Sequence, residues 1–126
     1  MTPLKILVVE DSPTMRQFIG FALRRLPGVE IAEASDGVEG LKRFNADHFH
    51  LLVVDINMPV MDGLKLVSLI RKGPFNAKIP ILVITTEGAQ ADRDRALSLG
   101  ADAYLPKPTP GSIILKTVKR LLGLSE

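Results

Sequence analysis

Side chains that can do chemistry follow four apolar runs of this sequence, at the point where each run ends. They are Glu10 and Asp11 after one run, Asp55 after another, Thr85 and Thr86 after a third, and Lys107 after a fourth. Carboxylates that lie close together repel each other unless a cation is present. Carboxylate oxygens suit Mg²⁺, which usually completes its coordination with waters and a phosphate. The set therefore indicates a magnesium site that receives a phosphoryl group.

The other members of this set have the chemistry that a phosphoryl group requires. The ammonium group of Lys107 supplies positive charge to phosphoryl oxygens, and a threonine hydroxyl supplies a hydrogen bond. A carboxylate such as that of Asp55 can be the nucleophile that forms an aspartyl-phosphate. Taken singly, an acid or a threonine at a strand end commonly caps the next helix, and a lysine is commonly a solvated charge. Their recurrence after four runs, in order, favours the functional interpretation.

Short apolar runs alternate with amphipathic segments five times along the chain. The apolar runs predict strands over residues 5–9, 29–34, 51–54, 81–84 and 103–105. Apolar residues at helical spacing predict helices over residues 15–26, 38–44, 64–70, 89–99 and 114–122. This alternation predicts an α/β fold, a five-stranded parallel sheet flanked by five helices with the flavodoxin-like strand order 2-1-3-4-5. In such a sheet, the side chains named above share the carboxyl edge, where ligands bind.

The composition limits the classes of function. The chain has 126 residues, no cysteine and a formal net charge of +2. We expect one domain over residues 1–126, without disulfides or a thiolate metal site. No apolar run is long enough for a membrane span and the N-terminus lacks the features of a signal peptide, so we expect a cytoplasmic protein without membrane contact. The absence of a basic run, with one tyrosine as the only polar aromatic residue, argues against direct nucleic-acid binding.

Several segments together resemble the motifs of the response regulator receiver domain family. The segments are VVEDS at 8–12, LVVDINMP at 52–59 with MDG at 61–63, ITT at 84–86 and GADAYLPKP at 100–108. The resemblance extends over nearly the whole chain. Because no output domain follows the last predicted helix, the chain is most similar to single-domain receivers of the chemotaxis type, the CheY-like proteins.

The resemblance implies a role for each acid of the predicted site. Asp55 would accept a phosphoryl group from the phosphohistidine of a histidine kinase. Asp11 and Asp55, with the backbone carbonyl of Asn57, would bind Mg²⁺, and Glu10 would act on the metal through a water. The protein would then be a signalling module that catalyses only its own phosphorylation and dephosphorylation, and not a metabolic enzyme.

The same resemblance assigns the residues around the phosphoryl group. Thr85 and Lys107 would bind its oxygens, and a cis bond before Pro108 would direct Lys107 toward the acids. The rotamer of Tyr104 would report the state of Thr85 to a partner-binding face.

Three residues near the acceptor would modulate the lifetime of the phosphoryl group. Asn57 and Glu87 match the chemotaxis type and would border the path of the hydrolytic water. Thr86 departs from the small residue usual in the family and would narrow access to the acceptor. The sequence also departs from the family at Thr109-Pro110, where an apolar residue is usual. This departure affects the expected start of the last helix.

We expect the partner-binding face on the fourth helix, the fifth strand and the last helix, because Thr85 and Tyr104 connect that side to the site. The basic residues on these elements are Arg93, Arg95, Lys116, Lys119 and Arg120. Opposite charges across an interface favour association. Besides a histidine kinase, we therefore expect an acidic output protein as a partner.

The residues leave three alternatives open. A Mg²⁺ phosphatase of the haloacid-dehalogenase type also forms an aspartyl-phosphate, but its nucleophile follows the first strand and a second Asp stands where this chain has Asn57. A flavodoxin-like nucleotide binder needs a phosphate loop after the first strand, where Glu10 and Asp11 would repel phosphate. A receiver from a non-chemotaxis or larger multi-domain system has the same motifs, and the sequence does not separate it from the chemotaxis type.

Overall fold

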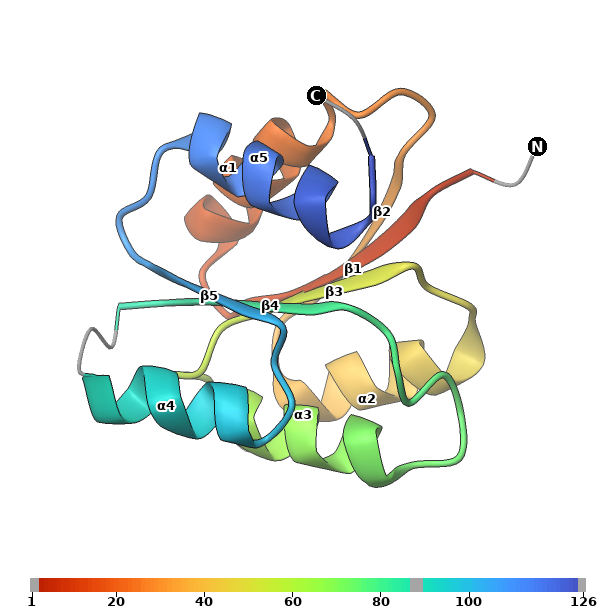
Figure 1. Cartoon of the computed structure of the whole chain (residues 1–126). Coiled ribbons are helices and arrows are strands. Elements are labelled where there is room, and N and C mark those ends of the chain that lie inside the picture. The colour runs from red at the N-terminus through yellow and green to blue at the C-terminus, as the bar shows by residue number, and fades with distance from the viewer. Residues whose placement is uncertain (1–2, 87–89, 125–126) are drawn as a thin grey trace.

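Five parallel strands form the central sheet, in a computed structural model that describes residues 3–86 and 90–124 (Figure 1). The strands are β1 (Lys5–Val9), β2 (Glu30–Ala34), β3 (Leu51–Val54), β4 (Ile81–Thr85) and β5 (Ala103–Pro106). Their order in the sheet is β2-β1-β3-β4-β5, which confirms the predicted fold. The three central strands are almost entirely apolar and buried because helices cover both faces of the sheet.

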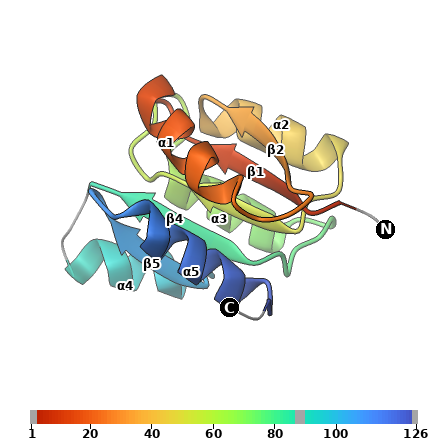
Figure 2. The ribbon, with the colours of Figure 1, turned by 90° about the horizontal axis from the view of Figure 1, so that it is seen from above.

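Helices cover the sheet in two layers. They are α1 (Pro13–Leu23), α2 (Gly37–Ala46), α3 (Gly63–Lys72), α4 (Gln90–Ser98) and α5 (Gly111–Leu121). One layer contains α1 and α5, which lie side by side, and the other contains α2, α3 and α4 (Figures 1 and 2). Successive side chains of a strand point to opposite faces. Leu7 and Val9 of β1 therefore join the core toward α2 and α3, whereas Ile6 and Val8 join the core toward α1 and α5.

Three helices begin close to the carboxyl edge of the sheet, each with a side-chain cap. The side-chain oxygens of Ser12, Asp36 and Asp62 accept the backbone N–H three residues later, at 3.2, 2.8 and 2.8 Å. Such caps satisfy N–H groups that the helix itself leaves unpaired. The caps therefore define where α1, α2 and α3 start. The start of each helix in turn limits the length of the short loop that precedes it, and these loops carry candidate site residues.

The start of α5 is built differently, at the place where the sequence departs from the family pattern. Pro110 occupies the N-cap position and provides no side-chain hydrogen bond. Thr109 is buried, and its hydroxyl donates to the carbonyl oxygen of Pro106. The helix begins at Gly111, three residues before the predicted start at 114.

Other element ends also differ from the prediction by a few residues. The helix predicted over 15–26 ends at Leu23, because the next residues form a tighter turn in which the backbone N–H of Leu26 donates to Leu23 (2.9 Å). The strand predicted from 29 begins at Glu30. The strand predicted over 81–84 includes Thr85, which places this hydroxyl within the sheet. The predicted start of the fourth helix, at 89, lies outside the described residues.

Candidate functional site

The carboxyl edge of the sheet brings three carboxylates together. Because β1 and β3 are adjacent parallel strands, Glu10 and Asp55 follow them side by side, and the backbone N–H of Asp55 donates to the carbonyl oxygen of Val9 (3.0 Å). Carboxylate oxygens of Glu10, Asp11 and Asp55 all lie within 4.8 Å of one another. Glu10 and Asp55 are buried, whereas Asp11 is exposed. The acids converge as the strand-end pattern predicts, and their individual roles stay predictions.

Lys107 reaches the same acids from the end of β5. Its Nζ lies 2.5 Å from Glu10 Oε1 and 3.3 Å from Asp55 Oδ2. These distances place the ammonium group among the acids and not in solvent. The cis bond predicted between Lys107 and Pro108 is present. We refer to Glu10, Asp11, Asp55 and Lys107 together as the acidic site.

The remaining predicted site residues lie on the strands and loops around the acidic site. Thr85 is buried and is the last residue of β4, the strand that pairs with β3, and Asp55 directly follows β3. Thr86 and Asn57 are exposed, and Tyr104 on β5 is half-buried. Glu87 lies outside the described residues. The roles that the sequence assigns to these five side chains stay predictions.

The acidic site carries more negative than positive charge. Three carboxylates face one ammonium group, which leaves two negative charges uncompensated. Burial raises the pKa of Glu10 above its ordinary value of 4.5, although hydrogen bonds from Lys107 and from the backbone N–H of Ser12 oppose this shift. Asp55 Oδ1 is buried and has no hydrogen-bond partner among the described residues. An oxygen-preferring cation would compensate the charge and use this oxygen, so the residues fit Mg²⁺.

Gly63, the last residue of the MDG motif, is a positioning residue for which the sequence predicts no separate role. A Cβ atom at this position would lie 2.1 Å from the backbone oxygen of Asp55. The backbone N–H of Gly63 donates to the carbonyl oxygen of Ile56 (2.9 Å), and Asp62 caps the helix that starts here. Only glycine lets the first turn of α3 approach the backbone at the end of β3 so closely. An Asp-Gly pair shortly after a strand-end acid is the signal that indicates this contact.

Four of the basic residues predicted for the partner face border hollows of the surface, and Lys116 and Arg120 share one of these hollows. Arg93 and Arg120 border a hollow of about 200 Å³ that Tyr104 also lines, between α4, β5 and α5. Lys116 and Lys119 border a different hollow, of about 230 Å³, together with Arg25 of α1. Arg93 and Arg120 therefore share a hollow with the predicted switch tyrosine, whereas Lys116 and Lys119 share one with a residue that follows α1.

Comparisons with known proteins agree with this geometry. The model of the response regulator receiver domain family matches residues 6–119. The chain is 38% identical to the chemotaxis protein CheY1 of Helicobacter pylori over 124 residues, which cover 98% of this chain and 100% of that protein. Among described residues, no helix is long and apolar enough to cross a membrane.

Two solved structures share the fold over nearly their full length. The chemotaxis response regulator CheY4 of Vibrio cholerae has a TM-score of 0.88 and 35% identity, covering 96% of this chain and 100% of that chain. The receiver domain of the sensor histidine kinase PA1611 from Pseudomonas aeruginosa, with a magnesium ion in its active site cleft, has a TM-score of 0.87 and 28% identity, covering 97% and 99%. Motifs, topology and relatives agree, and the chain belongs to the response regulator receiver domain family of two-component systems.

Proposed function

We propose that this receiver domain accepts a phosphoryl group on Asp55 from the phosphohistidine of a histidine kinase and then presents a changed surface to a partner. The observation that carries this proposal is the environment of Asp55, which is 4% exposed and lies 3.3 Å from the Lys107 ammonium group and within 4.8 Å of two further carboxylates. A carboxylate next to a cation site and a lysine is suited to form an aspartyl-phosphate.

In this transfer, a carboxylate oxygen of Asp55 bonds to phosphorus while the bond between phosphorus and the imidazole nitrogen breaks. The electron pair of the broken bond stays on that nitrogen. Lys107 and the hydroxyl of Thr85 stabilise the negative charge on the phosphoryl oxygens. In the proposed role, the rotamer of Tyr104 on β5 responds to the state of Thr85. This rotamer then changes the surface that the partner binds.

The same proposal assigns the metal ligands. Asp11, Asp55 and the backbone carbonyl of Asn57 would hold Mg²⁺, and Glu10 would act through a water. When bound, the metal neutralises negative charge on the phosphoryl oxygens. The uncompensated charge of the acidic site supports this assignment, and so does the magnesium ion in the receiver domain of PA1611.

Intact mass after incubation with acetyl phosphate and Mg²⁺ tests the acceptor. We expect the parent chain to gain one phosphoryl group and Asp55→Asn to gain none, because the amide is not a nucleophile for phosphorus. EDTA should abolish the gain. Asp94→Asn, an exposed acid on α4, is the matched control and should label like the parent. Equal labelling of Asp55→Asn would contradict the proposed acceptor.

We further propose a chemotaxis-type role with an acidic output protein at α4, β5 and α5. The 38% identity to CheY1 of Helicobacter pylori supports the first part, and Arg93 and Arg120 beside Tyr104 support the second. A pull-down from source-cell lysate with and without beryllofluoride, a phosphoryl mimic, tests both. An output protein retained equally in both conditions would contradict a phosphorylation-dependent face. A cytoplasmic location stays a prediction.

A further inference from the structure

A hollow of about 190 Å³ lies between α2 and α3, which are side by side in one helical layer (Figure 1). We call it the α2/α3 hollow. Its lining is apolar except for Asn45, and the other residues are Leu41 and Phe44 of α2, Leu69 and Ile70 of α3, and Gly73, Pro74 and Phe75, which follow α3. Sites for small organic ligands usually enclose about 300–1,000 Å³. The α2/α3 hollow is smaller, so its volume suits one large apolar side chain of a partner.

Phe75 at the border of this hollow is exposed on a loop that hydrogen bonds hold in place. Its side chain is 61% exposed. The side-chain amide of Asn76 donates to the carbonyl oxygen of Phe49 (2.8 Å), and Arg71 donates to the carbonyl oxygen of Ala77 (2.8 Å). The backbone on the carboxyl side of Phe75 is therefore fixed to the body of the domain. A partner that contacts this ring would lose little free energy to ordering of the loop.

The segments around the α2/α3 hollow carry charges of one sign. Residues 40–46 and 63–80 contain six Lys or Arg and no Asp or Glu. Arg71 pairs with Asp102. The other five are exposed and have no carboxylate of a described residue within ion-pair distance, and they are Lys42, Arg43, Lys65, Lys72 and Lys78. This surface therefore presents positive charge that the described part of the chain does not compensate.

Helical spacing places two of these lysines beside the α2/α3 hollow. Residues three apart are neighbours on the surface of a helix. Lys42 stands three residues before Asn45 on α2, and Lys72 stands three residues after Leu69 on α3. Asn45 and Leu69 both line the hollow. An occupant of the hollow therefore has one ammonium group on the α2 side and another on the α3 side.

We propose that the α2/α3 hollow binds a short acidic segment of a partner protein, which inserts one large apolar side chain beside Phe75 and places carboxylates near Lys42 and Lys72. The opposite charge of such a segment would favour and accelerate association. A second copy of this chain is disfavoured, because a two-fold contact would bring two basic surfaces together. A lipid surface is disfavoured, because a flat layer does not fill the hollow. The α2/α3 hollow includes no residue of the acidic site or of the proposed output face, so its binding does not require phosphorylation.

The probe is a synthetic peptide of about ten residues, which spans roughly 33 Å when extended, with one central phenylalanine between glutamates. Fluorescence anisotropy measures its binding to the full chain in EDTA, so that neither Mg²⁺ nor phosphorylation contributes. We expect saturable binding that weakens as salt is added. Two matched peptides, one with lysine in place of glutamate and one with serine in place of phenylalanine, should each bind at least about tenfold more weakly.

Variants at the hollow locate the binding site on the protein. Phe75→Ala and the double variant Lys42→Glu/Lys72→Glu should each weaken binding of the glutamate peptide by about tenfold, as loss of an apolar contact or of paired charges does. Asn45→Trp, at an exposed position of the lining, should fill the hollow and weaken binding in the same way. Circular dichroism should show the parent fold in all variants, because each substitution is at an exposed position.

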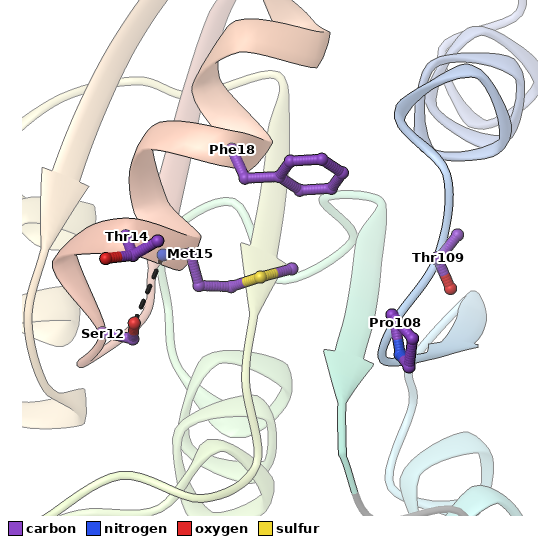
Figure 3. A pocket seen from close by; sticks show the side chains of 6 residues that line it. All are labelled: Ser12, Thr14, Met15, Phe18, Pro108 and Thr109. Carbon is purple, nitrogen blue, oxygen red and sulfur yellow. Dashed lines mark hydrogen bonds between the residues drawn. The ribbon is translucent and has the colours of Figure 1, made fainter.

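The matched controls lie on the other helical layer and at the acceptor. Phe18→Ala replaces another exposed aromatic residue (43% exposed), which lines a separate hollow opposite Pro108 (Figure 3). Arg25→Glu/Lys116→Glu reverses two exposed charges. Asp55→Asn removes the proposed acceptor of the phosphoryl group. These controls should change affinity for the peptide less than about twofold.

Three outcomes would overturn the proposal. The first is the absence of saturable binding of the glutamate peptide below about 1 mM, and binding to phosphatidylglycerol vesicles in that case would assign the surface to a lipid layer. The second is equal binding of the glutamate and lysine peptides. The third is an equal loss of affinity in the hollow variants and in the control variants.

Discussion

At the scale of single residues, the position of Asp55, the proposed acceptor, depends on neighbours that have no chemistry of their own. Gly63 lets the first turn of α3 pack directly against the backbone of the acceptor, and Asp62 caps that turn. The acceptor is thus held by backbone contacts on one side, while Lys107 and the other acids surround its carboxylate on the other. Small changes of backbone position here should therefore alter function as well as stability.

Gly63→Ala tests this contact. The new methyl group would lie 2.1 Å from a backbone oxygen, so either α3 or the strand end must move. We expect a loss of about 1–3 kcal/mol in unfolding free energy, measured by urea denaturation, and slower labelling by acetyl phosphate. Gly20→Ala in α1 is the matched control, because its nearest neighbour beyond the helix backbone is an Arg24 side-chain atom at 3.4 Å. It should stabilise the chain, since alanine favours a helix more than glycine does. Equal stability of parent and Gly63→Ala would contradict the role of this glycine.

The lifetime of the phosphoryl group should depend on the exposed side chains near Asp55. Asn57 is exposed two residues after the acceptor, where it can hydrogen-bond a water without blocking it. Asn57→Arg should fill that path and slow phosphate release by roughly tenfold, which corresponds to about 1.4 kcal/mol in the barrier. Thr86→Ala should speed phosphorylation by acetyl phosphate. Phosphate release after removal of the donor measures the first effect, and unchanged release from Asn57→Arg would show that this side chain does not control the water.

The sequence predicts this site well where one residue at a strand end decides the outcome. Glu10, Asp55 and Lys107 meet because parallel strands end at the same edge, which follows from topology alone. The role of Gly63 depends on a contact between two backbone segments, which no periodicity reports.

At the scale of elements, Arg71 connects three segments at the opposite edge of the sheet. From the end of α3 it donates to the carbonyl oxygens of Ala77, Ile79 and Gly100 and to the carboxylate of Asp102. This network holds the loops that enter β4 and β5. β4 ends at Thr85, and Lys107 directly follows β5. The helix and strand ends that the prediction missed, such as the end of α1 at Leu23, are also decided by local hydrogen bonds of this kind and not by apolar spacing.

Arg71→Met should therefore destabilise the chain strongly. The substitution keeps most of the apolar stem but removes all donors, which leaves partly buried carbonyl oxygens without partners. We expect a loss of about 2–4 kcal/mol in unfolding free energy, measured by urea denaturation. Lys72→Met, the exposed neighbour, is the matched control and should change stability by less than about 0.5 kcal/mol. Similar small effects of both variants would mean that water replaces the Arg71 donors.

At the scale of the whole molecule, the fold places its repulsive charges and its apolar core in different regions. The two cores lie between the sheet and each helical layer, and the acids lie at the carboxyl edge. Uncompensated charge at that edge opposes folding in the absence of a cation. A cation that binds only the folded chain should stabilise it, by about 1.4 kcal/mol at ten times its dissociation constant.

The dependence of stability on pH should follow from Glu10. Its pKa in the folded chain lies above 4.5, because burial disfavours the carboxylate more than the hydrogen bond from Lys107 favours it. Stability from such a group is fully present below its unfolded pKa and is lost as the pH rises through its folded pKa. In EDTA at pH 7, Glu10→Gln should therefore need more urea to unfold than the parent, and the difference should shrink as the pH falls below 4.5. Adding Mg²⁺ at pH 7 should raise the parent midpoint more than that of Glu10→Gln. A variant less stable than the parent at pH 7 would show that pairing with Lys107 outweighs the cost of burial.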